Sequence, residues 1–305
     1  MKIYTITLNP AYDIHATAVD FAAGHENLAT VTSREAGGKG VNISRALQAN
    51  GIPNTALVVL GTENAAEFRQ ELKNTGIDTC YLERPGRIRE NLTLHTPGQP
   101  ETRISFAGFP QDNAILQEVL EAMRIEEDTY VTFTGRIPSG MSVEKAKAFL
   151  LELKSRGAKL VLDSKSLTVE DILEIGPWLI KPNQEEISAY LQEPVSGMLD
   201  AVEATKIFEN RVENIMVSMG GQGAILVTGE YVYAVEPPKI QAVSTIGAGD
   251  STIAGFLAAV AMEESAPQRL KRAVAFGTAA CLTGGTLPPK PEDVEIVYQR
   301  TERIL

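Results

Sequence analysis

Two glycine-rich segments, each followed by an apolar helix-like run, carry the residues that could do chemistry. Residues 36–42 read AGGKGVN, and residues 244–251 read STIGAGDS. Glycines let a ligand approach backbone amides closely, and a helix N-terminus adds unpaired N–H groups and partial positive charge. Both segments therefore predict loops that hold phosphate oxygens. In the first, Lys39 offers a charge to a phosphate and Asn42 offers hydrogen bonds to sugar hydroxyls, unless it is only a flexible turn.

An acidic residue, Asp250, stands in the second segment directly after Gly247, Ala248 and Gly249. A carboxylate repels phosphate unless its role is to take a proton from an attacking hydroxyl. Phosphoryl transfer to an alcohol requires such a base beside a phosphate-binding loop. The residues alone leave a second interpretation equally open, in which Asp250 only caps the following helix.

Several familiar motifs are absent. Neither GxxxxGK[ST] nor GxGxxG occurs, which excludes a P-loop and a Rossmann fingerprint. The two cysteines, Cys80 and Cys281, lack CxxC spacing, and the three histidines, His15, His25 and His95, lack HxxxH spacing. We therefore expect no zinc site and no disulfide framework, and a reducing cytoplasm fits. His95 is expected to be solvated.

The charge balance excludes some partners. The chain has 305 residues, with 28 Lys and Arg against 39 Asp and Glu, so its formal net charge is −11. A nucleic-acid partner is not expected, because non-specific binding requires a basic face. No apolar run is long enough for a membrane helix, and residues 1–13 lack the apolar stretch of a signal peptide.

The chain alternates between two kinds of segment. β-branched and apolar runs indicate strands, whereas runs with helical spacing that end at glycine indicate helices. This alternation predicts an α/β fold, doubly wound around a mostly parallel sheet. The expected strands are 2–8, 55–60, 129–134, 160–162, 178–180 and 215–217, and the expected helices are 41–50, 65–74, 143–155, 251–262 and 270–281.

Two stretches break the alternation. Residues 90–96 and 101–107 predict a hairpin around the turn at 97–100, and residues 12–34 contain extended pieces without a helix. They predict a small β-lid beside the core, unless both are only surface loops. The expected division is a core of 1–11, 36–85 and 110–305, and a lid of 12–35 and 86–109.

The two glycine segments also resemble the defining motifs of the ribokinase-like, pfkB-type carbohydrate kinases. The resemblance covers the whole chain and includes TLNPAYD near the start, TGRIPSG at 134–140, IKPNQEE at 180–186 and VSMGGQGA at 217–224. It implies a ribokinase-like core with a β-lid that closes over a sugar. It also implies an activity that depends on ATP and Mg²⁺.

The resemblance implies roles for individual residues. Asp250 would be the catalytic base, and the amides of Gly247, Ala248 and Gly249 would stabilise the transferred group. On the acceptor side, Asp13 would bind sugar hydroxyls, and Lys39, Arg89 and Arg103 would meet the phosphate already on the substrate. The residues expected to bind the acceptor are Asp13, Gly37, Gly38, Lys39, Asn42, Arg89, Asn91 and Arg103.

On the nucleotide side, the family's Asn-x-x-Glu element corresponds to Asn183 and Glu186. It would organise Mg²⁺, although the same residues also fit an ordinary helix start after Pro182. The residues expected to bind the nucleotide are Lys165, Asn183, Ser218, Gly220, Gly223, Thr245, Gly247 and Gly249.

Within the family, TLNPAYD, the lysine of GGKG and the Arg-x-Asn of residues 89–91 are similar to kinases of phosphorylated ketohexoses. Fructose 1-phosphate is the expected acceptor, with tagatose 6-phosphate and fructose 6-phosphate as alternatives and a non-catalytic sugar-phosphate sensor as the different-class alternative. A homodimer through the lid is expected. Two departures bear on specificity: Ser244, where many members have Asp, leaves a potassium requirement open, and Arg136 stands where relatives often have Ser.

Overall fold

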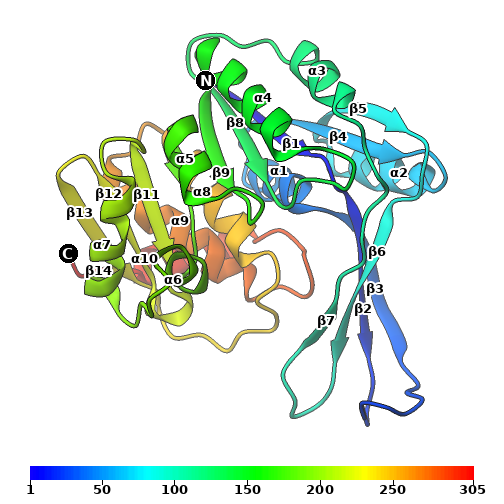
Figure 1. Ribbon diagram of the computed structural model, residues 1–305. Helices are drawn as coiled ribbons and strands as arrows, with labels where there is room; N and C mark the ends of the chain where they lie inside the picture. Colours follow the sequence, from blue (N-terminus) through cyan, green and yellow to red (C-terminus); the bar gives the residue numbers. More distant parts are fainter.

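A ten-stranded sheet forms the core of the computed structural model, which describes residues 1–305 (Figure 1). Its strand order is β14-β13-β12-β11-β10-β9-β8-β1-β4-β5. The strands from β11 to β5 in this order are parallel, and β12, β13 and β14 pair antiparallel at one edge. The strands are β1 Lys2–Thr7, β4 Thr55–Gly61, β5 Asp78–Arg84, β8 Thr129–Thr134, β9 Lys159–Asp163, β10 Leu179–Ile180, β11 Asn214–Ser218, β12 Ala224–Thr228, β13 Tyr231–Glu236 and β14 Glu302–Arg303.

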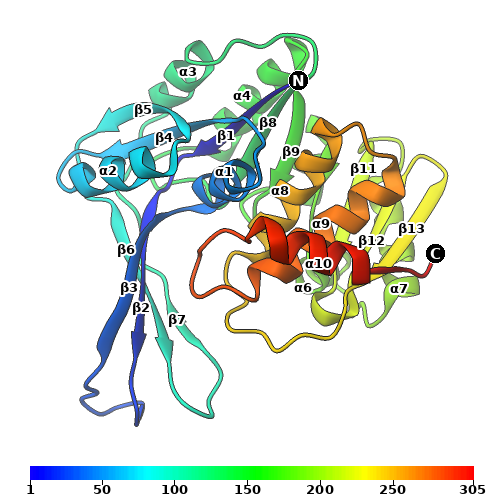
Figure 2. The same ribbon diagram turned by 180° about the vertical axis from the view of Figure 1, so that it is seen from behind.

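Helices cover both faces of this sheet. Figures 1 and 2 show α3, α4 and α5 on one face and α1, α9 and α10 on the other. The helices are α1 Lys39–Ala49, α2 Ala65–Thr75, α3 Ala114–Glu121, α4 Val143–Ser155, α5 Val169–Ile175, α6 Gln184–Leu191, α7 Met198–Thr205, α8 Ala248–Ala261, α9 Ala266–Ala280 and α10 Pro291–Arg300, with 3-10 turns at Lys206–Phe208 and Gly220–Gln222.

Burial on both faces explains the sequence of the central strands. Strand β4 reads TALVVLG and is buried from its second residue onward. Two hydrophobic clusters of 48 and 26 buried residues flank the sheet; the first includes side chains of α3, α4 and α5, and the second those of α1, α8 and α9. Parallel strands covered by helices on both faces are expected to be continuously apolar. None of the helices combines the length and apolar character that a membrane crossing requires.

A second sheet of four strands, in the order β3-β2-β6-β7, projects away from the core (Figures 1 and 2). Its strands are β2 Ala11–Thr17, β3 Thr30–Gly37, β6 Arg89–His95 and β7 Thr102–Ile104. Strand β2 lies in the middle, antiparallel to β3 and parallel to β6, and this register places Asp13 opposite Asn91. We call this sheet the lid sheet.

The base of the lid sheet is joined to the core by side-chain contacts. The buried Tyr12 hydroxyl donates to the Asn64 carbonyl at 2.7 Å, and the Arg34 guanidinium lies 3.5 Å from the centre of the Tyr12 ring. Asn64 Oδ1 also accepts a hydrogen bond from the Ile88 amide at 2.8 Å. The start of β2 and the start of β6 are therefore tied to the same asparagine.

The structure confirms the predicted fold class, and differs from the sequence-based prediction in detail. The hairpin forms, but its second strand is only the three residues Thr102–Ile104. The antiparallel edge of the large sheet was not predicted. His95 is not freely solvated, because its ring stacks on His15 with centroids 5.4 Å apart and its Nδ1 lies 3.2 Å from Glu101 Oε1. The exact division into core and lid at 12–35 and 86–109 stays a prediction.

Candidate active site

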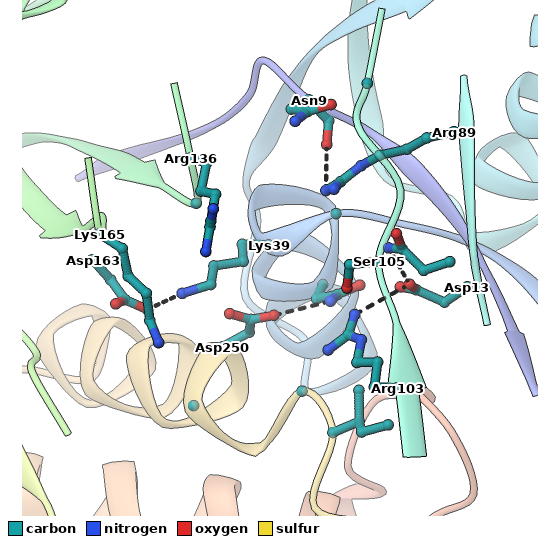
Figure 3. Close-up of a pocket in the computed structure, with 18 of the residues that line it drawn as sticks. Asn9, Asp13, Lys39, Arg89, Arg103, Ser105, Arg136, Asp163, Lys165 and Asp250 are labelled. Atoms are coloured by element: carbon teal, nitrogen blue, oxygen red, sulfur yellow. Dashed lines mark hydrogen bonds and ion pairs between the residues drawn. The ribbon is translucent and has the colours of Figure 1, made fainter. Parts of the chain in front are cut away.

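A cavity of about 740 Å³ lies between the lid sheet and the carboxyl ends of β1, β8 and β9. Ligands of open α/β sheets bind at this edge, because the connections that follow parallel strands meet there. Most of the predicted acceptor and catalytic residues line it, and Figure 3 shows several of them pointing into one space. The predicted residues that line it are Asp13, Gly38, Lys39, Asn42, Arg89, Asn91, Arg103, Lys165, Asn183, Glu186, Gly247, Gly249 and Asp250.

Asp250 lies in the first turn of α8 and is buried. Its Oδ2 accepts a hydrogen bond from Asn42 Nδ2 at 2.9 Å. The helix is capped by Gly247, whose φ of 78° is the left-handed conformation that glycine adopts readily, so the interpretation of Asp250 as the N-cap is wrong. Burial raises the pKa of Asp250 to about 6, and the nearby Asp163 adds to this effect against the opposing influence of Lys39 and Asn42.

Lys39 is the first residue of α1 and pairs with Asp163 at the end of β9, with Nζ 2.9 Å from Oδ2. The buried Lys181 approaches the same oxygen at 4.0 Å. Burial opposes the charge on each partner, yet the two lysines outweigh it and lower the pKa of Asp163, and Asp163 with Asp250 raises the pKa of Lys39. Lys39 is therefore a charged group held at a fixed place beside Asp250.

The lid sheet supplies a second charged group. Asp13 on β2 is buried, and its Oδ1 accepts hydrogen bonds from Asn91 Nδ2 at 2.9 Å and from Arg103 at 3.3 Å. Arg89 donates to the carbonyls of Phe106 and Asn9 at 3.0 and 3.3 Å and has no carboxylate partner. Asp13 is therefore an orienting acceptor in a strand and not a turn residue.

Gly37 does not line the cavity, but it is packed against Asp13, which does. A Cβ atom at this position would lie 2.5 Å from Asp13 Oδ2. The glycine therefore leaves the space that the Asp13 carboxylate occupies. The structure thus gives Gly37 a steric role, and direct contact of its backbone with a ligand stays a prediction.

A neighbouring cavity of about 660 Å³ joins the first at Lys181, Asn183 and Gly249. Gly223 has a φ of 99°, and a Cβ there would overlap the carbonyl oxygen of Val235, so only glycine fits this wall. The predicted residues that line this second cavity are Asn183, Ser218, Gly220, Gly223, Thr245, Ala248 and Gly249.

Asn183 and Glu186 form a reciprocal cap at the start of α6. Asn183 Oδ1 accepts from the Glu186 amide at 2.8 Å, and Glu186 Oε2 accepts from the Asn183 amide at 2.9 Å. The other oxygen, Oε1, lies 3.4 Å from Lys165 Nζ, and both side chains line the first cavity. The helix-start interpretation is thus correct, and it coexists with a carboxylate oxygen at the cavity.

Sequence reasoning assigned no role to several cavity residues. Asp163 received no role, and Lys181 appeared only within the segment 180–186. Each is a charged residue at or just after the end of an apolar strand, and this position was the signal that could have identified them. Asn9 also lines the cavity and directly follows the expected strand 2–8, whereas Ser105 lines it and carried no such signal.

The site and fold together define a class of protein. An α/β core, a lid, a buried carboxylate at a helix N-terminus and two adjoining cavities fit an enzyme that brings two ligands together. The pfkB family carbohydrate kinase profile matches residues 6–293. The chain belongs to this family, and it is a sugar kinase, a phosphotransferase.

Individual relatives agree with this assignment. The 1-phosphofructokinase of Escherichia coli strain K12 is 31% identical over 282 residues, covering 92% of this chain and 90% of that protein. The crystal structure of phosphofructokinase-2 from Escherichia coli in complex with substrates and products has a TM-score of 0.90 at 27% identity, covering 98% of this chain and 99% of that one. The same protein in complex with fructose-6-phosphate has a TM-score of 0.89 at 26% identity, covering 98% of each chain. Sugar-phosphate kinases are thus the relatives of this chain.

Proposed function

We propose that this protein transfers the γ-phosphoryl group of ATP to fructose 1-phosphate and so makes fructose 1,6-bisphosphate. The observation that carries this proposal is the placement of Asp250, buried at the start of α8 beside Lys39, in the same cavity as Arg89 and Arg103 of the lid sheet. One end of the cavity has a base, and the other has positive charge for a phosphate.

The acceptor fits the lid side of the cavity. Arg89 has no carboxylate hydrogen-bond partner, and its Nε is buried without any partner. Guanidinium groups bind phosphate through paired N–H donors, so Arg89 and Arg103 together suit the phosphate that the sugar already carries. Asp13 and Asn91 offer an acceptor and an amide to the sugar hydroxyls.

The second cavity suits ATP. The glycine wall at Gly223 permits a close approach to the backbone, and the cavity meets the first at Gly249, beside Asp250. Mg²⁺ keeps several waters and uses few protein carboxylates, so Glu186, with an oxygen at the cavity, is a chemically sufficient anchor. Asn183 fixes the position of Glu186 through the reciprocal cap. When bound, ATP with Mg²⁺ supplies the activated phosphoryl group.

Different residues of the chain have different roles in the transfer of the phosphoryl group. Asp250 accepts the proton of the acceptor hydroxyl while that oxygen bonds to the γ-phosphorus and the bond to ADP breaks. The amides at 247–249, at the start of α8, stabilise the charge on the transferred group. Lys39 was expected to meet the acceptor phosphate, but its pairing with Asp163 near Asp250 suits a positive charge beside the transferred group instead. Closure of the lid sheet would exclude water and limit hydrolysis of ATP.

We also propose a homodimer through the lid sheet. Several large apolar side chains of this region are exposed in a single chain, namely Val19, Leu28, Val31, Ile104 and Phe106. A second copy covering them would remove apolar surface from water. Sedimentation of Val31→Glu should give monomers, whereas Leu199→Glu, at an even more exposed apolar position on α7, should sediment like the wild type. A monomeric wild-type protein would contradict the dimer.

The cytoplasmic location stays a prediction.

A coupled assay of the pure protein tests the proposed reaction. Fructose 1-phosphate should give the highest kcat/KM among fructose 1-phosphate, fructose 6-phosphate and tagatose 6-phosphate. A higher value on fructose 6-phosphate would favour the activity suggested by the likeness to phosphofructokinase-2, and a higher value on tagatose 6-phosphate would favour the third acceptor. Binding of a sugar phosphate without turnover would favour a sensor and refute a kinase.

A further inference from the structure

Arg136 differs from every other cation of the first cavity in having no partner. Lys39 and Lys181 approach Asp163, Lys165 pairs with Glu186, and Arg103 pairs with Asp13, while Arg89 donates to two backbone carbonyls. Arg136 lines the same cavity, yet no hydrogen bond or ion pair involves its exposed side chain. Six cations and four carboxylates line this cavity, so it carries an excess of positive charge.

The backbone on both sides of Arg136 is held in place. The Gly135 amide donates to the Asp163 carbonyl at 2.9 Å, and the Ile137 amide donates to Ser166 Oγ at 3.1 Å. Two residues further on, the Ser139 carbonyl accepts from the Gln111 amide at 2.8 Å. A backbone held by hydrogen bonds on both sides, together with an unpaired guanidinium, is the arrangement expected of a preorganised binding group for an anion.

The position of Arg136 indicates which anion it meets. Figure 3 shows its side chain reaching into the cavity next to Lys39, across from Arg89 and Arg103 of the lid sheet. Burial lowers the pKa of Arg89, Asp13 opposes this effect, and the positive charges of Arg103 and Arg136 lower the pKa further. The charges that act most strongly on Asp250 belong instead to Lys39, Asp163 and Lys181. Arg136 thus faces the lid-sheet arginines across the cavity and is close enough to Arg89 for its charge to act on that side chain.

We propose that Arg136 is a specificity-determining residue that contacts the phosphate already present on the acceptor sugar and completes a clamp of three arginines. This inference rests on the proposed function, because it assumes a phosphorylated acceptor. Asp13 pairs with Arg103 alone, so the three guanidinium groups keep positive charge that a phosphate dianion neutralises. A neutral sugar gains nothing from this charge, so Arg136 raises the selectivity for a phosphorylated over an unphosphorylated acceptor.

The test compares Arg136→Ser and Arg136→Lys with Arg87→Ser, a control on an exposed arginine outside the cavity whose nearest carboxylate, Glu90, is 3.8 Å away. Steady-state assays would use fructose 1-phosphate, fructose 6-phosphate and unphosphorylated fructose. Isothermal calorimetry would measure binding of the two sugar phosphates without ATP. The calorimetry tests the role of Arg136 separately from the proposed reaction, because it reports binding of the acceptor even if no turnover occurs.

The expected result is a loss of acceptor binding with little loss of turnover. Removing one charge-assisted hydrogen bond to a phosphate should raise the KM and Kd of the preferred sugar phosphate about tenfold in Arg136→Ser. Arg136→Lys should recover part of this loss, and Arg87→Ser should match the wild type. The KM for ATP should stay within about twofold, and the selectivity over fructose should fall about tenfold.

Other outcomes would overturn the inference. A fall in kcat with unchanged acceptor Kd would place Arg136 on the transferred phosphoryl group, and unchanged kinetics would make it a solvated side chain. If the wild-type protein binds a sugar phosphate and Arg136→Ser binds it with the same Kd, the inference fails while the proposed function stands. If the wild-type protein binds neither sugar phosphate, the proposed function itself fails.

Discussion

Replacing Asp250 by Asn should lower turnover about 10²-fold or more and at the same time stabilise the fold. The ordinary pKa of 3.8 rises to about 6 in the folded protein, mainly because the carboxyl group is buried. Each pKa unit corresponds to about 1.36 kcal/mol, so keeping the carboxylate ionised at pH 8 costs about 3 kcal/mol of folding free energy. An amide is neutral at every pH, and its oxygen can still accept the hydrogen bond from Asn42.

The sign of the effect follows from the direction of the pKa change. A carboxyl group whose pKa is raised on folding stabilises the fold below its unfolded pKa, and this stability is lost as the pH rises through about 6. Wild type and Asp250→Asn should therefore be about equally stable near pH 4, and the variant should be more stable by about 3 kcal/mol at pH 8. For 305 residues, an unfolding entropy of about 2.1 cal/mol/K per residue converts this into a Tm about 5 °C higher.

The assay is thermal unfolding of both proteins across this pH range, together with turnover of the preferred sugar phosphate. Asp163→Asn is the matched contrast, because Asp163 is also a buried cavity aspartate but its pKa is lowered by Lys181 and Lys39. That variant leaves two cations without their shared anion and should lose about 3–5 kcal/mol.

Two results would refute this reasoning. A Tm of Asp250→Asn at or below that of the wild type at pH 8 would show that burial of the carboxylate is not costly. Turnover within a few-fold of wild type would show that Asp250 is not the base, because removing a general base should cost about 10²-fold or more.

Three further predictions concern pH and the glycines. The kcat/KM of the wild-type protein should fall as the pH drops below about 6, since protonated Asp250 cannot accept a proton; a profile that is flat to pH 5 would contradict this. Gly37→Ala should displace the Asp13 carboxylate and raise the acceptor KM about tenfold or more, with the KM for ATP nearly unchanged; equal effects on both constants would argue for general misfolding. Gly223→Ala should do the reverse, raising mainly the KM for ATP, because a Cβ there would overlap the Val235 carbonyl oxygen; a change confined to the acceptor KM would refute the nucleotide assignment of that cavity.

The sequence was a good guide to local structure. Alternating apolar strands and helical runs predicted the α/β class, and glycines at 51, 76 and 157 marked where helices stop. These features are local because side-chain spacing and the conformational freedom of glycine act within a few residues. The first residue of α8 was harder to predict. Asp250 and Gly247 are three residues apart, and both Asp and Gly can begin a helix.

What the sequence by itself determined about this protein is the set of chemical groups: a carboxylate in a glycine loop, a lysine in another, and two arginines on a hairpin. Only the tertiary structure decided which groups meet. Lys39 and Asp163 are 124 residues apart, and Asn42 and Asp250 are 208 residues apart. Their contact depends on the order of strands in the sheet, which the spacing of apolar residues within one element does not encode. The same holds for His15 and His95, which become neighbours only because β2 and β6 pair in parallel.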